Sequence, residues 1–146
     1  MKGENERLLY EILNEQYPGE WESDVVYLEG KAYRGDAVNR KHKVVIEVDG
    51  GLRPFWIKLK NGQRKKALKG GHSTPEGIER DMDKLNQSQL QGWRLLRYTP
   101  DTLRLRPWMI LSAVRQVCGA SIDDRMQMDL MGCKQGTLSQ VQVKIC

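Results

Sequence analysis

Two acidic residues close the most hydrophobic run of the chain. Residues 44–51 read VVIEVDGG, so Glu47 and Asp49 are separated by one residue. In a β-strand, residues i and i+2 lie on the same face, and we expect the two carboxylates to project together where a buried strand ends. Asp36, on the strand predicted before it, can join them across the sheet. The spacing therefore predicts that three carboxylates converge.

Three converging carboxylates repel one another in a low-dielectric setting, and a divalent cation relieves that repulsion. Mg²⁺ and Mn²⁺ prefer hard oxygen ligands, so Asp36, Glu47 and Asp49 are candidate metal ligands. Gly50 and Gly51 allow the backbone to bend away and a bulky substrate to come close. The alternative is that strands simply end at solvent. A single acid favours that reading, whereas three acids surrounded by basic residues favour a functional site.

Helices and strands alternate around these acids. An apolar stripe predicts a helix over residues 4–16, and Thr74 and Pro75 have the pattern of a helix start. Residues 43–49 predict a strand buried on both faces. The other predicted elements are strands over 24–28, 31–36 and 93–98, a turn over 39–42, a helix to about residue 90, a short helical turn from residue 99 and a helix over 107–117. We expect an α/β domain over residues 1–118 with a central mixed sheet flanked by helices, followed by a tail of uncertain structure over 119–146.

A long basic segment separates the acids from the next helix. Residues 50–74 are predicted to form a loop, and the alternatives are a disordered insertion or a small hairpin turning at Asn61-Gly62. Phe55 and Trp56 within it could stack on bases or anchor the segment to the core. The candidate nucleic-acid-binding residues in and around this segment are Arg34, Arg53, Lys58, Lys60, Arg64, Lys65, Lys66, Lys69 and Arg80.

Composition sets broad limits on the class of protein. The 146 residues carry a formal net charge of +5, which suits a polyanion and also an ordinary basic protein. No apolar run is long enough to cross a membrane, and the N-terminus lacks a signal-peptide pattern. The three cysteines lack metal-binding spacing, so we expect reduced thiols and a cytoplasmic location. The adjacent residues Trp108, Met109, Ile110 and Leu111 could form a homodimer surface or part of the core.

Several short motifs resemble the PD-(D/E)XK nuclease superfamily, and more narrowly the small phage-type endonucleases related to the very-short-patch repair group. The resemblance covers residues 31–100. The motifs that carry it are RGD at 34–36, IEVDGG at 46–51, GHST at 71–74, the helix residues Asp81, Lys84 and Asn86, and GWRLLR at 92–97.

The resemblance implies a restriction-endonuclease-like core and metal-dependent phosphodiester hydrolysis with Mg²⁺ or Mn²⁺. Asp36 and Glu47 would bind the metal. Asp49 stands where the superfamily usually has lysine, and it would be a third ligand. The role of the missing lysine would then fall to Lys84 or to His72, which follows a glycine here instead of the arginine usual in the subgroup.

Two functions from different classes follow from these residues. The first is a metal-dependent DNA endonuclease of phage or mobile-element type, acting on double-stranded or branched DNA in the cytoplasm of a bacterial host, with structure-specific or nicking activity. The second is a catalytically inactive nucleic-acid-binding module in DNA packaging or regulation. A decayed site would have lost one of Asp36, Glu47 and Asp49, and the chain retains all three. The complete acid set favours the enzyme.

Overall fold

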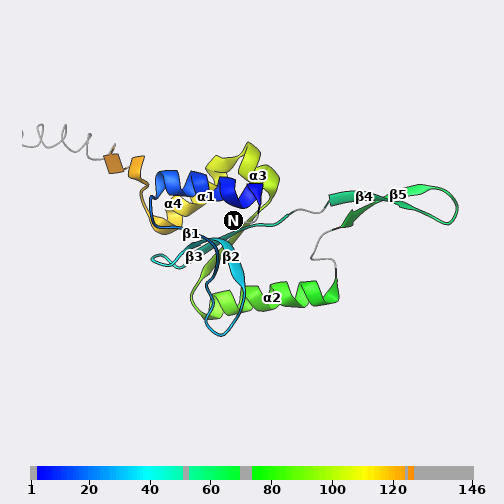
Figure 1. The fold of residues 1–146 in the computed structure, drawn as a ribbon, viewed down its shortest axis with the longest axis horizontal. Coiled ribbons are helices and arrows are strands. Elements are labelled where there is room, and N and C mark those ends of the chain that lie inside the picture. Colours follow the sequence, from blue (N-terminus) through cyan, green and yellow to red (C-terminus); the bar gives the residue numbers. More distant parts are fainter. Residues whose placement is uncertain (1–2, 51–52, 70–73, 124, 127–146) are drawn as a thin grey trace, which may run out of the picture.

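The structure is a computed structural model that describes residues 3–50, 53–69, 74–123 and 125–126; within 53–57 and 66–69 it describes the backbone alone. Helices and strands alternate along the chain (Figure 1). In chain order they are α1 (Glu4–Gln16), β1 (Glu22–Val26), β2 (Arg34–Asn39), β3 (Val44–Val48), β4 (Arg53–Lys58), β5 (Arg64–Lys69), α2 (Pro75–Leu90), β6 (Arg94–Tyr98), α3 (Pro100–Leu105) and α4 (Pro107–Cys118).

Four strands form the central sheet in the order β1-β2-β3-β6. The first three strands are antiparallel, and β6 runs parallel to β3. A parallel neighbour needs a crossover connection, and α2 supplies it between the two strands. The expected α/β class, with a mixed sheet flanked by helices, is confirmed.

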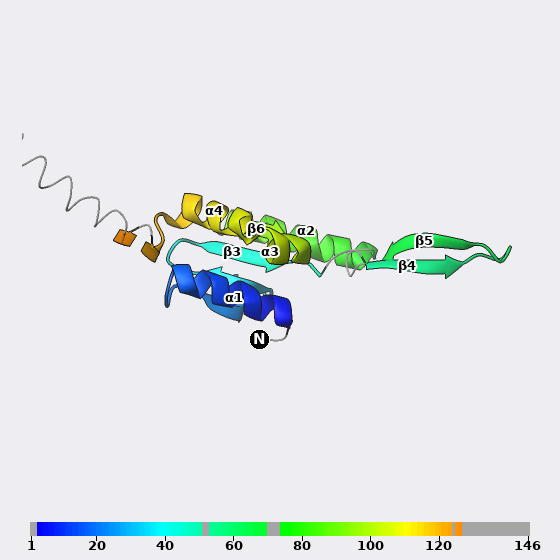
Figure 2. The ribbon, with the colours of Figure 1, turned by 90° about the horizontal axis from the view of Figure 1, so that it is seen from above.

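Helices cover both faces of this sheet (Figures 1 and 2). Helices α1, α3 and α4 pack on one face, where Leu13 and Ile110 are completely buried together with Ile46 of β3. The opposite face carries Val45 and Trp93 and lies toward α2. Strand β3 is therefore buried on both faces, as its continuous apolar run predicts.

The first two strands differ from the predicted spans. The sequence predicts strands over 24–28 and 31–36, whereas β1 ends at Val26 and β2 continues to Asn39. The apolar residues Tyr27 and Leu28 suggested a longer strand. Both are buried, but they leave the ladder and pack in the core on the Trp93 side of the sheet, with the Tyr27 and Trp93 rings 5.1 Å apart. Burial beyond the end of a strand therefore produced the error.

Within the described residues 53–69, the predicted loop is wrong and the hairpin alternative is correct. Strands β4 and β5 pair antiparallel and form a separate two-stranded sheet. The turn contains Asn61 and Gly62, and Gly62 has φ +81°, which glycine adopts without strain. This hairpin projects away from the body in both views (Figures 1 and 2).

Helix α2 begins as predicted and presents its polar side to the sheet. The Thr74 side chain accepts a hydrogen bond from the Gly77 amide at 3.1 Å, and Pro75 opens the first turn. Ser88 is fully buried and its hydroxyl lies 2.9 Å from that of Tyr27. The apolar stripe of Ile78, Met82 and Leu85 is exposed. The helix therefore docks through polar contacts, and this brings its charged residues to the sheet.

The last helix, α4, contributes one side to the core and leaves another side exposed. Helix α4 buries Ile110, while Trp108 and Met109 are exposed. Within the described residues, none of the helices is long and apolar enough to span a membrane. The tail predicted over 119–146 lies largely outside the described residues.

Candidate active site

Asp36 lies where the pairing between β2 and β3 ends. The last matched pair toward this end of the sheet is Ala37 with Ile46. One residue further along β2, the Asp36 carboxylate accepts a hydrogen bond from the Val48 amide at 2.8 Å. A side chain thus takes over a backbone donor that the ladder no longer satisfies. This contact fixes the carboxyl group beside the end of β3.

Glu47 is the most buried acid of the candidate site. Only 6% of its surface is exposed, and its carboxylate contacts the ammonium group of Lys84 from α2. The second carboxylate oxygen accepts from the Arg97 guanidinium at 3.3 Å. Lys84 also donates to the backbone carbonyl of Arg34 at 2.7 Å. Two cations therefore offset the buried charge of Glu47, as a buried carboxylate requires.

Arg97 of β6 connects three carboxylates, two at the end of β3 and one on α2. Its residue pairs with Glu47 in the parallel register of β3 and β6. In addition to Glu47, its guanidinium lies 3.7 Å from a carboxylate oxygen of Asp49 and 3.7 Å from one of Asp81 on α2. Arg97 therefore holds the end of β3, β6 and α2 together by charge.

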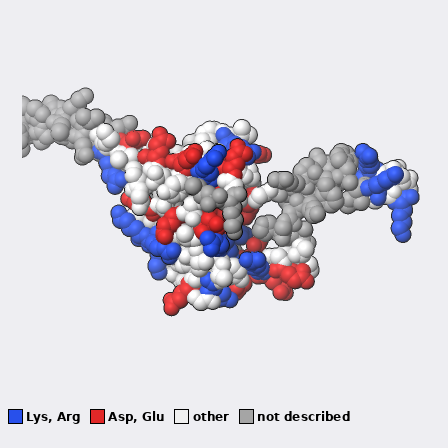
Figure 3. Space-filling model, in the orientation of Figure 1, with Lys and Arg blue, Asp and Glu red and all other residues white. Residues whose placement is uncertain are grey.

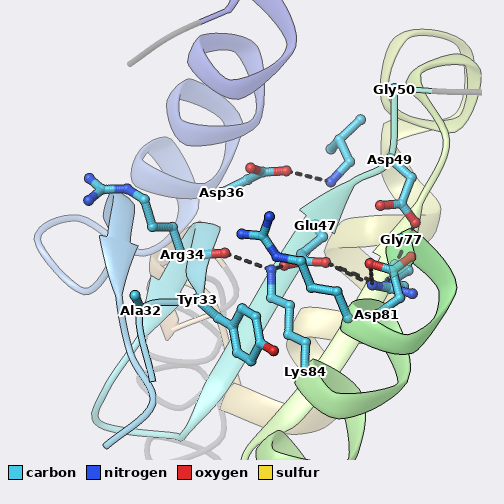
Figure 4. A pocket seen from close by; sticks show the side chains of 13 residues that line it. Ala32, Tyr33, Arg34, Asp36, Glu47, Asp49, Gly50, Gly77, Asp81 and Lys84 are labelled. Atoms are coloured by element: carbon cyan, nitrogen blue, oxygen red, sulfur yellow. Dashed lines mark hydrogen bonds and ion pairs between the residues drawn. The ribbon is translucent and has the colours of Figure 1, made fainter. Parts of the chain in front are cut away.

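These side chains line one open pocket of about 440 Å³ between β2, β3, β6 and α2 (Figure 4). Its lining includes four acidic and four basic side chains, so the wall is close to neutral when all are charged. The acidic residues are Asp36, Glu47, Asp49 and Asp81, and the basic residues are Arg34, Arg80, Lys84 and Arg97. An open pocket lined by paired charges of both signs suits a polar or charged ligand.

Burial in the pocket perturbs the ionisation of Asp36 and Lys84. Burial raises the pKa of Asp36 above its ordinary value, and the charge of Glu6 on α1 adds to that rise, while the hydrogen bond from Val48 opposes it. Burial lowers the pKa of Lys84 to about 8, with the nearby charge of Asp36 opposing the change. Perturbed groups gathered in one pocket are typical of functional sites.

The acids have the right chemistry for a hard cation, but in the described part of the chain they are not arranged as a ligand cluster. No three His, Cys, Asp or Glu side chains among the described residues form a group that could hold a metal ion. Oxygen donors are nevertheless available in the pocket from Asp36 and Glu47, with Asp49 nearby. Glu47 would have to exchange its contacts with Lys84 and Arg97 for the cation.

Six of the residues expected from the sequence meet at this pocket: Asp36, Glu47, Asp49, Lys84, Arg34 and Arg80. Lys84 reaches the acids from α2, as expected for a lysine supplied from outside the strand. Arg80 lies over the Tyr33 ring at 5.7 Å from its centre, and Arg34 pairs with Asp24 at 2.8 Å.

The remaining expected residues belong to the hairpin segment and lie away from the pocket or outside the described part. Exposed basic side chains at the end of the hairpin are Lys58, Lys60, Arg64 and Lys65. The side chains of Arg53, Lys66 and Lys69, together with those of Phe55 and Trp56, lie outside the described residues, and so does all of His72.

Sequence reasoning gave no site role to Arg97 or Asp81. Arg97 had a detectable signal, because matching the strand of residues 44–48 in parallel with that of residues 94–98 places it beside Glu47. Asp81 lies one helical turn before Lys84, so both reach the same pocket. Charge complementarity between predicted neighbouring strands is therefore the clue that could have identified Arg97.

Comparisons of this chain with models of protein families, with curated proteins and with solved structures find no significant match.

Proposed function

We propose that this protein is a metal-dependent DNA endonuclease whose active site is the pocket of Asp36, Glu47 and Lys84. The observation that carries the proposal is the meeting of Glu47 with Lys84. A buried strand carboxylate contacts a lysine from the crossover helix, beside a second carboxylate fixed at the end of the neighbouring strand.

The arrangement of the sheet supports a restriction-endonuclease-like core. The acids lie on β2 and β3, an antiparallel pair, and a further strand lies parallel to β3 after α2. The resemblance of residues 31–100 to the PD-(D/E)XK superfamily implies an antiparallel pair and further strands flanked by helices. The same resemblance assigns the metal-binding role to Asp36 and Glu47, the two acids held deepest beside β3.

Asp36 and Glu47 would hold Mg²⁺ or Mn²⁺, with Asp49 as a third oxygen donor. When bound, the cation would offset the charge of the scissile phosphate and lower the pKa of a bound water. The residues of the chain then account for positioning. Arg80 on the pocket wall can orient the phosphate through charge-assisted hydrogen bonds.

Among the basic side chains of the pocket, Lys84 is the candidate catalytic residue. Its Nζ contacts Glu47 and the Arg34 carbonyl, so its position is fixed by two partners. From there, the amine can orient the attacking water or stabilise the additional negative charge of the transition state. Arg97 is a positioning residue in this scheme, because it holds Glu47, Asp49 and Asp81 in place.

One observation favours the second candidate, a nucleic-acid-binding module without catalysis. Both oxygens of Glu47 already contact cations of the protein itself, which offset its charge without a metal. In that case the same pocket would be a structural charge network, and DNA binding would not depend on Mg²⁺.

Cleavage assays separate the two candidates. Supercoiled plasmid and a four-way junction are incubated with the protein in Mg²⁺, Mn²⁺ or EDTA, and nicked, linear and resolved products are separated on gels. We expect cleavage in either metal and none in EDTA. Tight, salt-sensitive DNA binding without cleavage in any metal would overturn the nuclease and favour the binding module.

A further inference from the structure

The hairpin of residues 53–69, here called the arm, is attached at the mouth of the pocket. Strand β3 ends at Val48, Asp49 lines the pocket, and β4 begins four residues later. After the arm the chain enters α2, whose Gly77 and Asp81 line the same pocket. Both ends of the arm therefore connect directly to elements of the candidate active site (Figure 1).

The arm holds the excess positive charge of the chain. Residues 50–75 include seven of the 24 Lys and Arg residues and none of the 19 Asp and Glu residues. The rest of the chain then has 17 basic and 19 acidic residues, which leaves it slightly acidic. Figure 3 shows basic side chains at the outer end of the arm. This charge is concentrated on a projection, which is a typical electrostatic footprint for a nucleic acid.

Positive charge occurs on both faces of the arm near its tip. Lys58 and Arg64 are directly opposite each other in the β4–β5 register, so they share one face. Lys65 is the next residue along β5, so it belongs to the opposite face. Like charges placed opposite each other destabilise a hairpin. The arm contains no acidic residue to offset them, so an external polyanion would relieve the repulsion.

We propose that the arm enters the major groove of duplex DNA and that its tip contacts phosphates on both walls of that groove. The inference rests on the proposed nuclease function, because it makes duplex DNA next to the cleaved phosphate the partner. A major groove about 12 Å wide admits a two-stranded β-ribbon. Charges on the two faces of a ribbon match the two phosphate walls of a groove, whereas a single strand would contact one face.

The length of the arm sets the distance between the DNA contacted by its tip and the phosphate bound in the pocket. Strand β4 has six residues, which at about 3.3 Å per residue give a reach of roughly 20 Å. One turn of B-DNA is about 34 Å, so the tip lies roughly half a turn from the phosphate in the pocket. The described residues form a single hairpin of this kind, so one chain makes this contact on one side of the cut only. The duplex requirement should therefore be asymmetric.

The test measures DNA binding across a series of salt concentrations in EDTA, with a labelled duplex of about 30 base pairs, roughly three helical turns. The arm variant combines K58Q, K60Q, R64Q and K65Q. The control variant removes the same charge from the body through R7Q, K41Q, R106Q and R125Q. The thermal midpoint of each variant checks its folding.

We expect the arm variant to lose at least about tenfold in affinity and to reduce the slope of log K against log salt by up to about 3.6, from four contacts at 0.9 each. The control variant should keep most of the wild-type affinity and most of the wild-type salt slope. The position of the cut is first mapped on the same duplex in Mg²⁺. In EDTA, duplexes shortened to within about five base pairs, or half a turn, of that position should bind more weakly when shortened on one side and normally when shortened on the other.

Three results would overturn the inference: equal losses in the arm and control variants, equal dependence on both sides of the cut, or single-stranded DNA that binds as tightly as duplex and with the same dependence on the arm. Absence of cleavage bears on the proposed nuclease alone. Arm-dependent duplex binding without cleavage would support the contact between the arm and DNA and would contradict the nuclease.

Discussion

Glu47 and Arg97 occupy paired positions of the parallel strands β3 and β6, and their side chains meet at 3.3 Å. The register of the sheet therefore sets this ion pair. Lys84, in contrast, reaches Glu47 from α2 and depends on how that helix docks. Because α2 keeps its apolar stripe exposed, its charged contacts with the sheet carry an unusual share of the docking. Charge in the pocket and the position of α2 are therefore coupled.

This coupling predicts non-additive stabilities for Glu47→Gln and Lys84→Met. Each single substitution leaves a largely buried charge with fewer partners, whereas the double substitution removes both charges. We expect a coupling free energy of about 1–3 kcal/mol in a double-mutant cycle measured by urea unfolding. Additive effects would contradict the contact between Glu47 and Lys84.

The exposed pair of Glu22 and Arg40 is the matched control for this cycle. It is also an ion pair, at 2.5 Å, but the side chains are 47% and 50% exposed. Solvent screens such a pair, so we expect a coupling of about 0.2–1 kcal/mol from the corresponding cycle of Glu22→Gln and Arg40→Met. If the coupling free energy of Glu22 and Arg40 were as large as that of Glu47 and Lys84, burial would not be the cause of the strong coupling.

Gly35, next to Asp36 on β2, is predicted to tolerate no side chain. A Cβ atom there would lie 2.4 Å from Cγ2 of Val45 and 2.8 Å from Cγ2 of Val38. Gly35→Ala should therefore lower the free energy of unfolding by about 1–3 kcal/mol through overpacking. At Gly50 a Cβ would meet nothing within 4 Å, so Gly50→Ala should change stability little. Equal stabilities of the two variants in urea would contradict this packing.

Asp83 should make folding sensitive to acid. Hydrogen bonds from Tyr33 at 2.6 Å and Lys31 at 3.0 Å lower the pKa of the Asp83 carboxyl below its usual range. A lowered native pKa adds stability above the unfolded pKa, near 4, and this stability is lost as pH falls through the native value. We expect the free energy of unfolding, measured in urea at a series of pH values, to fall less steeply toward acid pH in Asp83→Asn than in the wild type.

Tyr33→Phe tests the cause of that acid sensitivity. It removes the largest contribution to the lowered pKa and leaves the carboxylate in place. The loss of stability toward acid pH should therefore weaken without disappearing, because Lys31 still donates to Asp83. If Tyr33→Phe lost stability toward acid pH as steeply as the wild type, other carboxylates would be responsible for the acid sensitivity.

Metal binding should be visible in the thermal stability of the protein without DNA. A cation that binds only the folded state at 100 times its dissociation constant adds about 2.7 kcal/mol. Mg²⁺ or Mn²⁺ should therefore raise the thermal midpoint by several degrees, and Asp36→Asn and Glu47→Gln should each abolish most of that shift. The control is Glu22→Gln, which replaces an exposed acid on a strand and should keep the metal-induced rise in the thermal midpoint. Equal shifts in all four proteins would exclude Asp36 and Glu47 as ligands.

The sequence predicted the elements whose signals are local. Thr74 and Pro75 marked the start of α2, and the continuous apolar run of residues 44–46 marked a strand buried on both faces. The end of β1 was misplaced because Tyr27 and Leu28 are buried outside the ladder. Local hydrophobicity reports burial, and it does not distinguish a paired residue from one that packs beyond the end of a strand.

The sequence predicted Asp36, Glu47, Asp49 and Lys84 as site residues of the pocket, and it missed Arg97 and Asp81. The i, i+2 spacing of Glu47 and Asp49 is visible within one strand, whereas the contact with Arg97 requires the register between strands that are 50 residues apart in the sequence. The exposed Ile78 and Met82 stripe likewise gave no indication that α2 docks through its polar side. Long-range pairing, which a single sequence encodes weakly, decided both features.

The most direct measurement of the central claim compares Glu47→Gln and Lys84→Met with Glu22→Gln in the cleavage of supercoiled plasmid in Mg²⁺ under single-turnover conditions, after thermal midpoints have shown that each variant is folded. We expect the two pocket variants to lose at least about a hundredfold in rate, at the lower end of the range for acid–base and electrostatic groups, while Glu22→Gln cleaves like the wild type. Cleavage by folded Glu47→Gln at the wild-type rate would contradict the assignment of this pocket as the active site.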